Sequence, residues 1–194
     1  MAMPAPPPLV PDTSRRDWTA EERNALPDDG NRYEVVDGEL LVTPAPTFRH
    51  QRAALRLAQL LAPYCDRLGI ECVVAPADVT FSPRTVVEPD LFVIPLIDGR
   101  PASRFEDVGR LVLAVEVVSP ASARADRYVK RRFYQSEGVP EYWIVDTSDR
   151  FVERWRPEDE SPEIVTESLA WLPREDAEQL VIDLPAYFRR VHGG

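Results

Sequence analysis

Glu116 is the residue whose position most strongly indicates chemistry. It stands inside the apolar run Leu111–Val118 (LVLAVEVV), which predicts a strand covered on both faces. A carboxylate buried there loses its hydration, which is unfavourable unless the group is paired, bound to a metal or neutralised. Two interpretations stay open at this point: a core ion pair with an arginine, or a metal ligand or catalytic acid.

Asp90 is a second acid in an apolar context, in the segment Val87–Val93 (VEPDLFV). Pro89 cannot donate to a sheet ladder, so it predicts an edge or a bulge that redirects the next side chain. A plain Pro-Asp turn is the alternative. Taken with Glu116, Asp90 gives two strand-borne carboxylates, and such oxygen ligands suit Mg²⁺ or Mn²⁺.

The segment after Glu116 adds a cation. Asp126, Lys130 and Tyr134 are spaced four and four, so they share one face of a predicted helix. Lys130 is the only lysine among 23 basic residues. Arginine cannot replace lysine where a compact charge or a tunable pKa is needed, so we assign Lys130 a catalytic role. Tyr134 is a candidate accessory residue because it shares the same helix face. An ordinary Asp126–Lys130 pair, worth about 0.3–0.5 kcal/mol, is the alternative.

The charge of the chain limits its partners. The formal net charge is −10, which argues against bulk attraction to nucleic acid. Residues 122–133 carry a local charge of +4, and only this stretch is expected to face a phosphate backbone, through Arg124, Arg127 and Arg131. A solvated basic helix face explains the same charges equally well.

Periodicity and turn signals indicate an α/β fold with a central mixed β-sheet flanked by two principal helices. Thr19 and Glu22 form a capping box for a short helix, and Asp37-Gly38 predicts a tight hairpin turn. Longer helices are expected at Thr47–Leu68 and from about Ala121 to Glu137, and a short one from Ala186. Strands are expected at Arg32–Val36, Glu39–Thr43, Ile70–Val74, Asp78–Phe81, Val86–Ile94, Leu111–Ser119, Glu141–Asp146, Phe151–Trp155, Ile164–Val165 and Leu180–Asp183.

The 194 residues predict one domain, residues 15–194, after a flexible Pro-rich tail, residues 1–14. The longest apolar run, Leu111–Val115, is far shorter than the ~20 residues of a membrane span. The N-terminus shows no secretory signal, so a cytoplasmic location is expected. Cys65 and Cys72 are predicted to be buried reduced thiols.

Several segments together resemble the Uma-two family, a bacterial group of restriction-endonuclease-like proteins in the PD-(D/E)XK nuclease superfamily. The resemblance spans nearly all of residues 19–190 and implies a restriction-endonuclease-like core with an N-terminal β-hairpin extension. The segments that carry it are Arg32–Leu40 (RYEVVDGEL), His50-Gln51, Glu88–Leu91 (EPDL), Val115–Pro120 (VEVVSP), the Asp126, Lys130 and Tyr134 spacing, and Gly138–Asp146 (GVPEYWIVD).

The resemblance implies roles for individual residues. Asp90 matches the aspartate of the Pro-Asp element, and Glu116 matches the second acid. The superfamily places a lysine two residues after that acid, but Val118 stands there, and Lys130 is the residue that can replace it. His50 falls where related nucleases keep an additional polar site residue, although a surface histidine is the simpler interpretation.

The implied activity is metal-dependent hydrolysis of phosphodiester bonds, and the resemblance favours DNA over RNA. Asp90, Glu116 and the Val117 carbonyl would hold Mg²⁺ or Mn²⁺. Two alternatives stay open: a catalytically degenerate nuclease fold that acts as a binding or regulatory module, and a structural homo-oligomer. In the second alternative, exposed aromatic residues such as Tyr142, Trp143 or Trp155 would form the interface, although aromatic residues on strands are more often core residues. A homo-oligomer is expected, and a dimer is the first assembly to consider.

Overall fold

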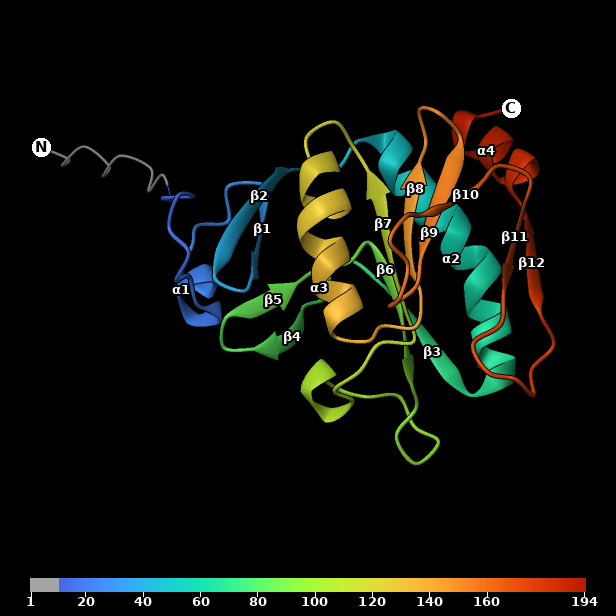
Figure 1. The fold of residues 1–194 in the computed structure, drawn as a ribbon, viewed down its shortest axis with the longest axis horizontal. Helices are drawn as coiled ribbons and strands as arrows, with labels where there is room; N and C mark the ends of the chain where they lie inside the picture. Colours follow the sequence, from blue (N-terminus) through green and yellow to red (C-terminus); the bar gives the residue numbers. More distant parts are fainter. Residues whose placement is uncertain (1–10) are drawn as a thin grey trace, which may run out of the picture.

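The computed structural model describes residues 11–194, and its centre is a six-stranded mixed sheet (Figure 1). The strand order is β10-β9-β8-β7-β6-β3. The pair β7 and β8 is parallel, whereas all other neighbours are antiparallel. The strands are β3 (Ile70–Val74), β6 (Leu91–Pro95), β7 (Leu113–Val118), β8 (Tyr142–Asp146), β9 (Phe151–Trp155) and β10 (Glu163–Val165).

The two faces of this sheet are covered by different elements, as Figure 1 shows. One face packs against α2 (Phe48–Leu68), α4 (Leu184–His192) and the ribbon of β11 (Ser168–Trp171) and β12 (Leu180–Asp183). Helix α3 (Arg131–Ser136) and a smaller sheet cover the other face. Every residue of β7 is buried, as predicted. The α/β class and the flanking helices are therefore confirmed.

Alternation along β7 decides where Glu116 points. Val115 and Val117 pack in the core beneath α2, whereas Ala114 and Val118 pack in the core beneath α3. Because successive strand side chains point to opposite faces, Glu116 lies on the α3 face. That face is also the one that the N-terminal hairpin covers.

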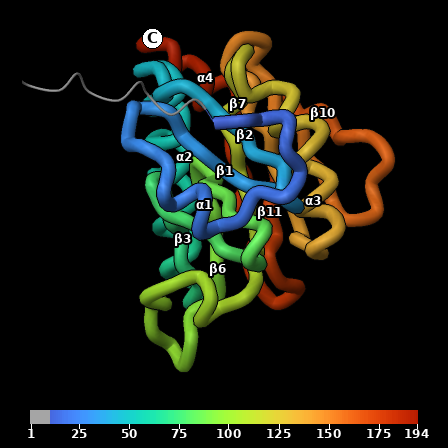
Figure 2. Tube along the Cα trace, turned by 90° about the vertical axis from the view of Figure 1, so that its left-hand side faces the viewer, coloured from blue at the N-terminus to red at the C-terminus, as the bar shows by residue number. Residues whose placement is uncertain are grey.

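The smaller sheet has the order β2-β1-β5-β4 and contains the predicted hairpin. Its strands are β1 (Asn31–Val36), β2 (Glu39–Pro44), β4 (Val79–Ser82) and β5 (Thr85–Val87). Asp37 and Gly38 have φ values of 50° and 85°, which a tight primed turn requires. Figure 2 shows the hairpin in blue in front of the main sheet, beside α1 (Ala20–Asn24), whose predicted capping box is present.

The predicted strand Val86–Ile94 is wrong in one respect, because it is two strands in two sheets. β5 belongs to the small sheet and β6 to the large one, and Glu88-Pro89-Asp90 connects them. Proline offers no N–H to a ladder, so the chain leaves one sheet at Pro89 and enters the other at Leu91. Asp90 is thereby placed between the two sheets.

The helix predicted from Ala121 to Glu137 contains an irregular section. Residues Ala125–Lys130 (η2) are π-helical, and the N–H of Arg131 donates to the carbonyl of Asp126, five residues earlier. π-Helical turns are rare and are frequent at functional sites. Both Asp126 and Lys130 are buried in this section.

Other expectations meet the structure with mixed results. The predicted tail falls mostly on residues 1–10, outside the described residues. Cys65 is buried, as predicted, but Cys72 is only half-buried.

The aromatic side chains considered for an exposed interface are core residues: Tyr142, Trp143 and Trp155 are all buried. The interface built on them is therefore wrong. β11 was not predicted, and a 3₁₀ turn, η1 (Phe105–Asp107), lies before β7.

Candidate active site

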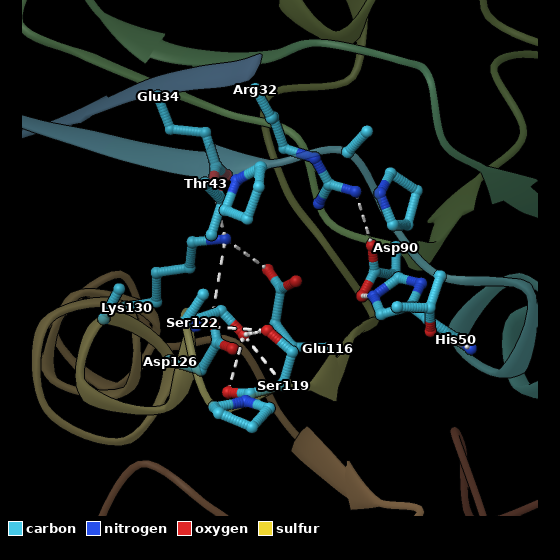
Figure 3. Close-up of a pocket in the computed structure, with 17 residues that line it drawn as sticks. Arg32, Glu34, Thr43, His50, Asp90, Glu116, Ser119, Ser122, Asp126 and Lys130 are labelled. Atoms are coloured by element: carbon cyan, nitrogen blue, oxygen red, sulfur yellow. Dashed lines mark hydrogen bonds and ion pairs between the residues drawn. The ribbon is translucent and has the colours of Figure 1, made fainter. Parts of the chain in front are cut away.

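A cavity of about 240 Å³ lies between the hairpin, the start of α2, the end of β7 and η2. The structure brings four of the predicted site residues to its wall: His50, Asp90, Glu116 and Lys130. Figure 3 shows them converging from separate elements. Three further charged side chains complete the wall, namely Arg32, Glu34 and Asp126.

Lys130 is buried and points into a group of carboxylates. Its Nζ lies 2.7 Å from Glu34 Oε2, 2.9 Å from Glu116 Oε1 and 3.6 Å from Asp126 Oδ1. Burial alone would lower the pKa of Lys130, but the surrounding carboxylates raise that pKa well above its ordinary value. The ammonium therefore stays charged. The alternative pair within the helix, to Asp126, is the longest of the three contacts.

Asp90 is held by three donors. Arg32 Nη2 lies 2.8 Å from Oδ1, while His50 Nε2 and the backbone N–H of Val117 lie 2.9 Å and 2.8 Å from Oδ2. Burial works to raise the pKa of Asp90, but the hydrogen bonds and charges of His50 and Arg32 and the Val117 N–H together lower it. Asp90 is therefore an ionised carboxylate with fixed geometry.

The pKa of Glu116 is shifted in the opposite direction to that of Asp90. Complete burial raises the pKa of Glu116 well above its ordinary value, Lys130 opposes this, and the nearby carboxylates of Asp126, Asp90 and Glu34 raise it further. Two acids whose surroundings push their pKa values apart are typical of catalytic sites. Glu116 does not form the core pair with an arginine that was one of its two interpretations. Its partner is Lys130, and it is Asp90 that pairs with an arginine.

The charge balance of the cavity fits a divalent cation. Four carboxylates and two cationic side chains line it beside His50, so the formal charge of the acids, Arg32 and Lys130 together is −2. Within residues 11–194, His50 Nδ1 and Asp126 Oδ1 are buried without a hydrogen-bond partner. Across the same residues, however, no three His, Cys, Asp or Glu side chains are gathered as a ready metal site. Carboxylate oxygens and an excess of acids suit Mg²⁺ or Mn²⁺. In this structure the two central acids are paired with side-chain cations, Asp90 with Arg32 and Glu116 with Lys130.

The two accessory candidates differ. The His50 side chain is only 13% exposed and contacts Asp90, so it is not the surface histidine that was the simpler interpretation. Tyr134 is completely buried beside Tyr142, with ring centroids 4.8 Å apart, and it does not line the cavity. Tyr134 packs behind the site.

The three arginines predicted to bind nucleic acid are not brought together in the cavity. Arg127 pairs with Asp146 at 2.9 Å and with Glu153 at 2.6 Å. Arg131 lies over the Trp155 ring at 4.8 Å. Arg124 is exposed, next to Ala125 of the cavity wall.

Sequence reasoning gave Arg32 and Glu34 no role in the site, although they lie in a predicted hairpin strand and in a segment that carries the family resemblance. Glu34 is 1% exposed and also accepts a 2.8 Å hydrogen bond from the Glu88 N–H. The signal that singled out Glu116 was present here too, because Glu34 is an acid between Tyr33 and Val35 in a strand. Its partner, Lys130, is 96 positions away in the sequence.

Comparison with known proteins identifies the family of this chain. The sequence profile of the Uma2 family, described as "Putative restriction endonuclease", matches residues 20–185. A crystal structure described as a "putative nuclease belonging to DUF820", from Anabaena variabilis, is 19% identical with a TM-score of 0.73, covering 90% of this chain and 99% of that one. No curated protein sequence matches the chain. The profile covers all the elements that form the cavity, so this chain belongs to the Uma2 family of restriction-endonuclease-like proteins.

Proposed function

We propose that this protein is a divalent-metal-dependent nuclease that hydrolyses phosphodiester bonds, with Asp90, Glu116 and Lys130 at the centre of its site. The observation that carries the proposal is the meeting of Asp90 and Glu116 with the single lysine in one cavity whose charged lining sums to −2. Buried like charges at this density are unfavourable unless a cation joins them or one of the acids takes up a proton, and a divalent cation satisfies several of these carboxylates at once. A structural ion pair alone would not require the excess of acids.

Asp90, Glu116 and the Val117 carbonyl are the groups proposed to hold Mg²⁺ or Mn²⁺. The N–H of Val117 donates to Asp90. Because the N–H and C=O of one strand residue point to the same edge, the Val117 carbonyl also faces Asp90. A divalent ion held there would polarise the scissile phosphate and lower the pKa of a bound water.

The protein's own side chains supply the rest of the chemistry. Lys130 is positioned to neutralise charge that develops on the phosphate, because its ammonium is fixed and desolvated. His50 and Arg32 orient Asp90 from two sides. Both are positioning residues in this proposal.

DNA is the proposed substrate, on the basis of the family description, and Arg124 is the predicted nucleic-acid contact that is exposed beside the cavity. Within residues 11–194, no helix has the length and apolar content of a membrane span. We place the protein in the cytoplasm, which suits its two free cysteines, and we propose a homodimer as the first assembly to test.

Cleavage of DNA in Mn²⁺ tests the proposal. Asp90→Asn, Glu116→Gln and Lys130→Arg are each expected to abolish cleavage, the last because a planar guanidinium cannot reproduce a compact ammonium between two carboxylates. Glu153→Gln is the matched control, a buried glutamate outside the cavity that should cleave like the native protein. Full cleavage by the three site variants would refute the assignment.

One observation favours a second function, that of a binding or regulatory module that has lost catalysis. Each central acid already has a basic partner, Arg32 for Asp90 and Lys130 for Glu116. A module of this kind would take up no metal. Calorimetric titration with Mn²⁺ separates the two functions, because an enzyme should give binding heat that disappears in Glu116→Gln.

A further inference from the structure

A groove of about 580 Å³ runs along the outer side of α2 and shares a wall with the candidate active site. His50 and Asp90 line both the groove and the cavity of the candidate active site. The other groove residues come from the first half of α2 and from the end of β3 and the residue after it, including Val74 and Ala75. Figure 3 shows His50 and Asp90 side by side in the wall of the cavity.

The groove exposes apolar side chains that a folded chain normally covers. Phe48 is 90% exposed, Leu55 is 56% exposed and Val74 is 45% exposed. Phe48, Arg52 and Leu55 stand at positions i, i+4 and i+7 of α2, so they share one helix face. The opposite face of α2 is buried against the main sheet.

The charge of this region reverses that of the chain. Residues 40–65 contain no aspartate or glutamate but three arginines, Arg49, Arg52 and Arg56, although the whole chain has 33 acids. Arg52 and Arg56 line the groove, and the one acid there, Asp90, is paired with Arg32 and His50. Within residues 11–194, Arg49 has no acidic partner and is exposed.

We propose that this groove binds a stretch of unpaired nucleic acid and guides it to the active site, with Phe48 as a stacking platform for a base. The inference rests on the proposed function, because it names the form of the substrate. Single-strand binding combines an arginine-lined track for phosphates with exposed aromatic rings on which bases stack. Phe48 offers such a ring only to a base that is not paired.

The charge pattern favours this occupant over a second copy of the chain. A second copy has a net charge of −10 overall. In a twofold contact centred on this groove, however, the surface that it presents would be its own α2 segment, which lacks acids and carries arginines. Like charges would then face each other across the contact. A polyanion has no such conflict.

Fluorescence anisotropy with a labelled single-stranded DNA and a duplex of equal length, both in EDTA, tests the groove without cleavage. Phe48→Ala should weaken single-strand binding at least about fivefold, and Phe48→Trp should restore it. Arg49→Ala should lower the salt slope of single-strand binding by about 0.7. Tyr128→Ala, a 58% exposed aromatic on η2, and Arg100→Ala, beyond the far end of β6, are controls expected to bind normally.

Three outcomes would overturn the inference. Unchanged single-strand affinity in both Phe48→Ala and Arg49→Ala is the first. Tighter binding of the duplex than of the single strand is the second. The third is a native protein that sediments as a dimer while Phe48→Ala sediments as a monomer with unchanged DNA affinity. That result would mean that a second copy of the chain covers the groove in the native protein. Because Phe48 is exposed, its replacement removes no core packing.

The same proteins separate this inference from the proposed nuclease. Binding in EDTA depends on the groove, whereas Mn²⁺-dependent cleavage depends on Glu116 and Lys130. Native protein that binds single strands with the predicted Phe48 dependence but never cleaves them would remove the nuclease proposal alone. Native protein that cleaves duplex and single strands equally well, with no Phe48 dependence, would remove the groove alone.

Discussion

The ammonium of Lys130 lies 2.7 Å from the carboxylate of Glu34, and this contact connects the helix after β7 to the N-terminal hairpin. Both side chains are almost completely buried. The hairpin is therefore part of the site, because it supplies a charge that Lys130 needs. Several consequences of this arrangement can be measured.

Lys130→Met should destabilise the protein in a pH-dependent way. It leaves Glu34, Glu116 and Asp126 buried without their cation, and breaking such pairs typically costs about 3–5 kcal/mol. Burial already raises the pKa values of Glu116 and Asp126 above their unfolded values, and Lys130 opposes this rise, so its removal lets the folded variant bind more protons. The variant therefore loses stability as pH rises, and its deficit relative to the native protein should shrink as pH falls toward the ordinary carboxyl range.

Urea unfolding of Lys130→Met at several pH values measures this effect. Arg132→Met, an exposed neighbour in the same helix, is the control and should cost little at any pH. A deficit that stays constant or grows on acidification would contradict the buried charge network.

Glu116→Gln should make the metal-free protein more stable. It removes one of four crowded carboxylates, the one whose pKa burial raises well above its ordinary value. A gain of about 1 kcal/mol corresponds to a rise in Tm of about 2–4 °C for a protein of this size. Thermal unfolding in EDTA is the measurement, and a lower Tm would be the opposing result.

Mn²⁺ should stabilise the native protein but not Glu116→Gln. A ligand at a hundredfold excess over its Kd adds about 2.7 kcal/mol of stability. The Tm of native protein and of the Glu153→Gln control should rise together with added Mn²⁺. Equal shifts in Glu116→Gln would place the metal elsewhere.

Arg127→Ala separates a structural from a nucleic-acid role. Its guanidinium joins Asp146 and Glu153, and leaving Glu153 without its partner should cost about 1–3 kcal/mol of stability. Arg124→Ala should leave stability unchanged and weaken DNA binding, because Arg124 is exposed. Chemical unfolding and a binding titration on both variants decide between them, and the reverse pattern would restore Arg127 as a DNA contact.

Gly38→Ala should destabilise the hairpin that carries Arg32 and Glu34. Gly38 has a φ of 85°, and an added Cβ would collide with the side chain of Arg84 and the carbonyl of Arg16. A loss of about 1–3 kcal/mol is expected. Gly30→Ala is the matched control, with a φ of 86° and open space around the added Cβ, so it should lose less. Equal losses would mean that backbone strain alone matters.

Local pattern was enough to find much of this fold and part of its site. The capping box at Thr19, the turn at Asp37-Gly38 and the buried strand around Glu116 each depend on neighbours within a few residues, and the structure has all three. The sequence marked Pro89 as an irregularity in a predicted strand, but it did not show that the strand divides there into two. Only pairing with distant strands shows that β5 and β6 belong to different sheets.

The sequence by itself determined which acids and which lysine are unusual, because an ionisable group in an apolar run, or a lone ammonium among arginines, is anomalous wherever the chain folds. The tertiary structure decided the partners. Arg32 meets Asp90 and Glu34 meets Lys130 across 58 and 96 positions of sequence. Such pairings depend on how the hairpin packs over the main sheet, and local residue spacing carries no information about that packing.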